Sequence, residues 1–223
     1  MSRGSKAVVL LSGGIDSSTT LYEARSRGYR CHCLIVDYGQ RHRKEVHAAQ
    51  RIARAAGCPA HLLSLRLPWG GSALTDRQIR VPKNRSLAAI GRGIPSTYVP
   101  ARNTIFLGLA ASLAETLGAS AIFIGANAID YSGYPDCRPA YYERFDQVIR
   151  RGTRAGAEGR PFRIVTPLIR KTKAQILRLG KRLQVPYHLT WSCYLGKARP
   201  CGRCDSCLLR AKGFREAGAS DPV

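Results

Sequence analysis

The sequence predicts an α/β fold built on one parallel sheet of about five strands, followed by a C-terminal segment that binds a metal. Three observations predict it. Short apolar runs alternate with helical segments over the first 65 residues, which is the pattern of parallel βαβ units. A turn rich in glycine and serine joins the first apolar run to the first helix. Four cysteines gather near the C-terminus.

The expected strands are short apolar runs bounded by turn residues, and the expected helices end at glycine or proline signals. The strands are Ala7–Leu11, Cys31–Asp37, Ala60–Leu65, Ala121–Ile124 and Phe162–Pro167. The helices are Asp16–Arg27, Lys44–Ala56, Arg102–Leu117, Tyr141–Arg151 and Thr172–Leu183. The first run has the length of a buried parallel strand, whereas the second alternates only weakly.

Two connections stand out between these elements. Residues 66–100 carry eight glycines and prolines, and an insertion of this length inside an α/β domain is usually functional. Residues 127–138 form a polar loop directly after the fourth strand. Because ligands of open α/β sheets bind outside the carboxyl ends of the strands, we expect this loop beside a ligand.

Length and composition exclude several classes of protein. At roughly 150 residues per domain, 223 residues predict one main domain, at 1–187, with an appendage at 188–223. A hydrophobic content of 44% excludes disordered and fibrous chains. No apolar run approaches the ~20 residues that span a bilayer, and the N-terminus lacks the apolar core of a signal peptide. We therefore expect a cytoplasmic protein with no membrane partner.

The formal net charge of +22 has two interpretations. A basic surface attracts nucleic acid or another polyanion. The charge also reflects composition, since 28 arginines accompany 8 lysines in a chain rich in alanine and glycine. We favour composition, and we expect that nucleic acid is not required for function.

The string L-S-G-G-I-D-S-S, at residues 11–18, follows a strand and opens a helix. Its small residues let the backbone wrap around an anion, and a helix N-terminus supplies unpaired N–H groups. The string lacks the Gly-Lys-Ser/Thr ending of the mononucleotide P-loop, so it suits a released pyrophosphate better than a transferred γ-phosphate. Asp16 is out of place beside an anion unless a cation such as Mg²⁺ lies between them. The structural alternative is a plain turn with Asp16 as the helix N-cap.

This string resembles the S-G-G-x-D-S motif of the PP-loop ATP pyrophosphatases. The resemblance implies a Rossmann-like sheet of the PP-loop/HUP type, cleavage of ATP between its α and β phosphates, and adenylation of a substrate oxygen. It also implies that ATP contacts the first strand, the loop, the first helix and the end of the second strand. The expected ATP-binding residues are Leu10, Leu11, Ser12, Gly13, Gly14, Ile15, Asp16, Ser17, Ser18, Thr19, Thr20, Leu21 and Val36.

Four clustered cysteines have the spacing of a metal site. They are Cys193, Cys201, Cys204 and Cys207. Two tight C-x-x-C spacings can close a tetrahedral zinc site, and a catalytic zinc would leave one position open. Redox thiols and an iron–sulfur cluster are the alternatives. We expect a structural Zn²⁺ that replaces a core which this arginine-rich tail cannot supply. Cys31 and Cys33 are expected in the core, and Cys137 as a buried thiol.

Taken together and in order, several strings resemble the family of 7-cyano-7-deazaguanine synthases, which are PP-loop enzymes of queuosine precursor biosynthesis. The matching stretches are Leu11–Leu21, Asp37–Glu45, Pro95–Phe106, Asp130–Arg138 and Cys193–Gly213, and they extend over nearly the whole chain. One departure is Ala101, where the family pattern leads us to expect glycine. If that position needs a positive φ, alanine imposes strain.

The resemblance implies an ATP-dependent ligase that forms carbon–nitrogen bonds. The carboxylate of 7-carboxy-7-deazaguanine is adenylated, ammonia converts the acyl-adenylate to an amide, and a second adenylation followed by elimination gives the nitrile. ATP, Mg²⁺ and Zn²⁺ are the implied cofactors, and we expect a homodimer. Asp16 and Arg102 are the expected catalytic residues. The expected substrate-binding residues are Arg102, Asp130, Tyr134, Asp136 and Arg138.

Two other functions stay open at this point. One is a PP-loop enzyme that acts directly on tRNA, which would use the basic charge but lacks an obvious separate RNA domain in a chain this short. The other is a relative that joins the deazaguanine carboxylate to a protein amine and stops at the amide.

Overall fold

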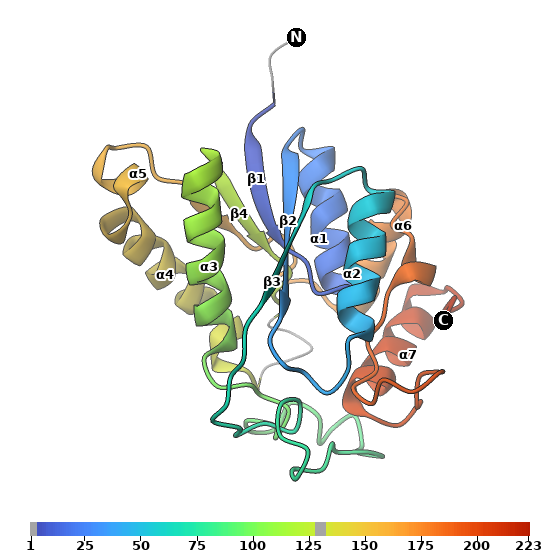
Figure 1. Ribbon diagram of the computed structural model, residues 1–223. Coiled ribbons are helices and arrows are strands. Elements are labelled where there is room, and N and C mark those ends of the chain that lie inside the picture. Colours follow the sequence, from blue (N-terminus) through green and yellow to red (C-terminus); the bar gives the residue numbers. More distant parts are fainter. Residues whose placement is uncertain (1–3, 128–132) are drawn as a thin grey trace.

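The structure is a computed structural model that describes residues 4–127 and 133–223, and its centre is one sheet of five strands (Figure 1). The strands are β1 (Lys6–Leu10), β2 (Arg30–Asp37), β3 (Ala60–Ser64), β4 (Ala121–Ile124) and β5 (Arg163–Val165). They follow the order β3-β2-β1-β4-β5, and every neighbouring pair is parallel. The predicted parallel sheet is confirmed. The strand order reverses between β1 and β4, which is where open α/β sheets bind their ligands.

Helices cover both faces of the sheet (Figure 1). The elements are α1 (Ile15–Ser26), α2 (Lys44–Ala55), α3 (Arg102–Leu117), α4 (Pro139–Gly152), α5 (Arg154–Ala157), α6 (Lys173–Arg182) and α7 (Asp205–Ala217), with 3₁₀ turns η1 (Pro135–Cys137) and η2 (Tyr187–Leu189). Helices α1 and α2 pack on one face, and α3 and α4 on the other. None of the helices in the described ranges has the length and hydrophobicity that crossing a bilayer requires.

The core consists of two layers because successive strand residues point to opposite faces of the sheet. Val9 of β1 is fully buried and packs toward α1 and α2, in the same cluster as Cys31 and Cys33 of β2. The adjacent Val8 is also fully buried and packs toward α3. The prediction that Cys31 and Cys33 belong to the core is confirmed.

The C-terminal segment contains a helix that the sequence analysis did not predict. Helix α7 packs on α6, and Phe214 is buried in a cluster with Ile176 and Leu177. Arg210 is also buried, because its guanidinium donates to both carboxylate oxygens of Asp221, at 2.7 and 2.8 Å. The segment therefore packs against α6 of the main domain, and a buried arginine is tolerated there because it is paired.

Ala101 has a φ of 52° and precedes the first residue of α3. The structure therefore gives this alanine the left-handed conformation that glycine adopts without strain. We expect Ala101→Gly to raise the free energy of unfolding by about 1 kcal/mol, measured by urea denaturation. Gly118, at the other end of the same helix, has a φ of 60° and a neighbourhood open enough for a methyl group. Gly118→Ala should shift stability by a similar amount in the opposite direction. A destabilised Ala101→Gly protein would contradict the argument.

Candidate active site and metal centre

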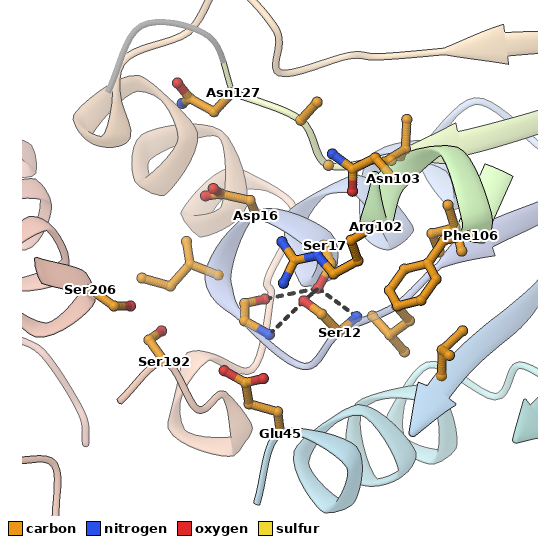
Figure 2. A pocket seen from close by; sticks show the side chains of 18 of the residues that line it. Ser12, Asp16, Ser17, Glu45, Arg102, Asn103, Phe106, Asn127, Ser192 and Ser206 are labelled. Carbon is orange, nitrogen blue, oxygen red and sulfur yellow. Dashed lines mark hydrogen bonds between the residues drawn. The ribbon is translucent and has the colours of Figure 1, made fainter. Parts of the chain in front are cut away.

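A pocket of about 280 Å³ lies at the carboxyl ends of β1, β2 and β4. One end of it is apolar, with Leu10, Leu34, Val36 and Phe106 in its wall. The rest is polar and includes the loop between β1 and α1, the start of α3 and side chains from the C-terminal segment (Figure 2). An apolar slot beside a polar loop suits a nucleotide, whose base is flat and whose phosphates are charged.

The loop between β1 and α1 is held by its own serines and by two close backbone approaches. The hydroxyls of Ser12 and Ser17 lie 3.0 Å apart, and Ser17 Oγ also accepts from the Ser12 N–H at 3.2 Å (Figure 2). Gly13 has a φ of 84°, and a Cβ there would lie 2.4 Å from the carbonyl oxygen of Glu45. A Cβ on Gly125 would lie 2.9 Å from the backbone of Asp16. Both contacts are with backbone atoms, so neither glycine can be replaced without moving the loop.

No side chain caps the N-terminus of α1, where Gly14 is the N-cap residue. The alternative of a plain turn capped by Asp16 is therefore wrong. The uncapped N–H groups and the helix dipole favour an anion at this end of α1, as the string at residues 11–18 predicted.

Asp16 instead pairs with a lysine that the sequence analysis did not single out. Lys173 Nζ lies 2.6 Å from both carboxylate oxygens of Asp16, and only 9% of the lysine side chain is exposed. Lys173 is the first residue of α6. On α7, Gly213 leaves space for its aliphatic stem, because a Cβ there would lie 2.3 Å from Lys173 Cγ. The sequence signal that could have pointed to Lys173 is its position shortly after β5, at the same edge of the sheet as the loop at residues 11–18.

The structure brings most of the expected ATP-binding residues into the pocket wall. Those in the wall are Leu10, Leu11, Ser12, Gly14, Ile15, Asp16, Ser17 and Val36. The other five lie behind it, and they are Gly13, Ser18, Thr19, Thr20 and Leu21. The reason is helical geometry: Ser18 and Thr19 donate their hydroxyls to the carbonyls four residues earlier, at 2.7 and 2.8 Å, and Leu21 is fully buried in the core.

Two of the expected substrate residues line the pocket. Arg102 begins α3, and its Nη1 donates to Tyr38 Oη at 3.2 Å. Its guanidinium carbon also lies 5.7 Å from the centre of the Tyr38 ring, which favours the cation. Burial opposes the charge, yet the neighbouring tyrosines Tyr38 and Tyr134 leave the pKa of Arg102 raised. Tyr134 lines the pocket, with its hydroxyl 3.0 Å from Thr97 Oγ1.

Two other expected substrate residues, Asp136 and Arg138, are not in the pocket wall. Asp136 is buried, and its Oδ2 accepts from the backbone N–H of Asn103 at 3.2 Å, so it occupies a donor in the first turn of α3. Burial also raises its pKa. Arg138 is exposed and precedes α4. Asp130 lies outside the described residues.

The C-terminal segment supplies one wall of the pocket, which the sequence did not predict. The Trp191 N–H donates to the carbonyl of Gly13 at 2.9 Å, so this segment is joined to the loop at residues 11–18. Ser192, Tyr194 and Ser206 line the pocket beyond that contact. Lys44 Nζ lies 4.3 Å from the centre of the Trp191 ring and covers its face.

The four cysteines predicted as metal ligands form one cluster. The sulfur atoms of Cys193, Cys201, Cys204 and Cys207 all lie within 4.8 Å of one another. The pair Cys201–Cys207 is 3.9 Å apart, close to the ~3.8 Å expected between two sulfurs on a tetrahedral ion with 2.3 Å bonds.

The surroundings of this cluster suit thiolates. The backbone N–H groups of residues 195 and 201 donate to Cys193 Sγ, and those of residues 203 and 204 donate to Cys201 Sγ, at 3.3 to 3.5 Å. Such bonds stabilise negative sulfur. Ala73 and Val81 of the long insertion pack on the cluster and keep it from water. The donor set therefore fits a closed tetrahedral metal site.

Cys137 lines the pocket but is buried, with only 9% of its surface exposed. Desolvation raises the pKa of its thiol to about 12. A thiol that stays neutral is a poor nucleophile, which agrees with the expectation of a buried thiol.

Known proteins match the chain over almost its full length. A family model described as queuosine biosynthesis protein QueC matches residues 6–218. The 7-cyano-7-deazaguanine synthase of Anaeromyxobacter dehalogenans (strain 2CP-C) is 58% identical over 225 residues, covering 100% of this chain and 96% of that protein. The synthase of Thermosynechococcus vestitus (strain NIES-2133 / IAM M-273 / BP-1) is 56% identical over 221 residues, covering 98% and 94%.

Among solved structures, NMN synthetase from Francisella tularensis has a similar fold, with a TM-score of 0.50 and 13% identity, covering 98% of this chain and 89% of that one. That likeness concerns the fold alone. The match over residues 6–218 and the identity of more than half to full-length relatives show that this chain belongs to the queuosine biosynthesis protein QueC family.

Proposed function

We propose that this protein is a 7-cyano-7-deazaguanine synthase, an ATP-dependent ligase that converts 7-carboxy-7-deazaguanine and ammonia to the nitrile. The observation that carries the proposal is one continuous pocket in which an uncapped helix N-terminus and the half-buried Arg102 face a common space. A phosphate-binding end next to a carboxylate-binding arginine is what adenylation of a carboxylate needs. The names of the relatives support the same substrate class.

The residues of the pocket have separable roles in this proposal. The loop of Ser12, Gly14 and Ser17 holds the pyrophosphate that leaves, while the apolar end with Leu10 and Val36 holds adenine. Arg102 orients the substrate carboxylate toward the α-phosphate. Charge stabilisation and alignment are then sufficient, because AMP is a good leaving group and no nucleophilic side chain is required.

Two metal ions belong to this proposal. Asp16 would hold the Mg²⁺ that accompanies ATP, with Lys173 fixing the carboxylate in place. When bound, this Mg²⁺ would neutralise part of the negative charge of the ATP phosphates. The four cysteines would hold one structural Zn²⁺, as their sulfur geometry permits. We also expect the protein to be a homodimer in the cytoplasm.

Product analysis tests the proposal. Incubation with 7-carboxy-7-deazaguanine, ATP, Mg²⁺ and ammonium is expected to give AMP, pyrophosphate and a product whose mass is that of the nitrile. ADP and phosphate as the first products would contradict PP-loop chemistry. A product that stays at the amide would favour the relative that joins the carboxylate to a protein amine.

The charge of +22 gives one specific reason to consider a tRNA-acting enzyme. We expect tRNA to leave the rate of nitrile formation on the free base unchanged, because the proposed substrate is a small heterocycle. The comparison is steady-state turnover with and without tRNA at low salt, where phosphate contacts are strongest. A large increase on adding tRNA would favour the tRNA-acting enzyme instead.

A further inference from the structure

Glu45 lies in the pocket next to the loop proposed to bind phosphates. It is the second residue of α2 and lines the pocket. Its backbone abuts Gly13 so closely that a Cβ on that glycine would lie 2.4 Å from the Glu45 carbonyl oxygen. Figure 2 shows the carboxylate pointing into the pocket, on the side of Ser12 and Ser192. Glu45 is therefore fixed beside the place where the phosphates and the reacting carboxylate meet.

The carboxylate of Glu45 has no hydrogen bond or ion pair to any residue in the ranges 4–127 and 133–223. Asp16, the other acidic residue of the pocket wall, is paired with Lys173. Desolvation raises the pKa of Glu45 to about 7, although the positive field of Arg102 opposes this. A desolvated carboxylate is costly without a partner, and its negative charge repels both ATP and a substrate carboxylate. A small cation bound at Glu45 would give this carboxylate a partner and would remove its repulsion of ATP and of the substrate carboxylate.

We propose that Glu45 binds the ammonium ion and accepts the proton that must leave before nitrogen can attack. This rests on the proposed function. One N–H bond of ammonium breaks as an O–H bond forms on Glu45. The freed nitrogen lone pair then forms a bond to the acyl carbon, the bond from that carbon to the AMP oxygen breaks, and a second proton leaves the nitrogen. The products are the amide, AMP and the two protons.

A competing assignment for Glu45 is recognition of the deazaguanine amidine edge. That edge lies at the opposite end of the bicyclic ring from the carboxylate that reacts. Glu45 is in contact with the loop that binds the leaving pyrophosphate, so its position favours the reacting end.

The test separates adenylation from attack by nitrogen. Glu45→Gln keeps the size of the side chain but removes its charge and its ability to take a proton. Three rates are measured: ATP–pyrophosphate exchange that depends on 7-carboxy-7-deazaguanine, amide formation from ammonium, and hydroxamate formation from hydroxylamine. Hydroxylamine is mostly unprotonated at neutral pH, so it attacks without prior loss of a proton. Glu143→Gln, on the exposed surface of α4, is the matched control.

For Glu45→Gln we expect kcat/KM for ammonium to fall by about 100-fold or more, the usual size of a proton-transfer contribution. Exchange and hydroxamate formation should stay within a few-fold of wild type, and the control should keep all three rates. Normal ammonium kinetics in Glu45→Gln would refute the inference. Loss of exchange would also refute it and would assign Glu45 to ATP or to the heterocycle. If wild-type protein shows no exchange, the proposed function itself fails.

Discussion

Cys204→Ser is expected to remove soluble, folded protein from the cell extract. A structural zinc site contributes about 10–16 kcal/mol to folding, which equals or exceeds the whole stability of about 5–15 kcal/mol that a domain of this kind has. Cys204 is fully buried and is the N-cap residue of α7. The measurement is the soluble yield together with the rate of proteolysis of whatever protein remains.

Cys58→Ser is the control, since this half-buried cysteine lies outside the metal cluster. It should express like wild type and contain one zinc per chain by elemental analysis. Zinc-free wild-type protein that is soluble and resistant to protease would show that the four thiols fold the tail without a metal.

Asp16→Asn is expected to reduce turnover by about 10²–10³-fold, the size of effect seen when an active site loses one preorganised electrostatic group. The same change leaves Lys173 buried and unpaired. Because the side chains of Lys173 and Asp16 are only 9% and 23% exposed, the substitution should also lower the free energy of unfolding by about 3–5 kcal/mol. The readouts are steady-state turnover and urea denaturation of the same preparation.

A second substitution separates the two effects. Adding Lys173→Met to Asp16→Asn removes the unpaired charge, so the double variant should recover much of the lost stability. Turnover should stay low, because the carboxylate proposed to hold Mg²⁺ is still missing. If turnover returns together with stability, the pair is structural and the catalytic role of Asp16 is wrong.

Local patterns in the sequence were sufficient to predict the sheet and the loop at residues 11–18. The run at residues 7–11 and the loop that follows are defined by neighbours in the chain, so their burial and their place at the strand end could be predicted. The cysteine cluster was predictable for the same reason. The pairing of Lys173 with Asp16 could not be predicted, because the two residues lie 157 positions apart and only the packing of α6 against α1 brings them together.

Asp136 shows a second reason why part of the site could not be predicted from the sequence. An acidic residue in a polar loop after a strand has the same appearance whether it binds a ligand or a backbone N–H. Its partner is Asn103 at the start of α3, and nothing in either string distinguishes that contact from a substrate site. Helix α7 was missed because its apolar face is narrow, with Phe214 and Leu209 among several basic residues.

The contact between Trp191 and Gly13 has a consequence for the order in which the protein matures. A ribosome makes the loop at residues 11–18 early in synthesis, yet the wall that faces it comes from residues 191–210. A nascent chain that has emerged as far as α6 therefore has every strand of the sheet but an open site. The pocket is complete only when the segment that carries the four cysteines has packed against the loop, which requires almost the whole chain to have been synthesised.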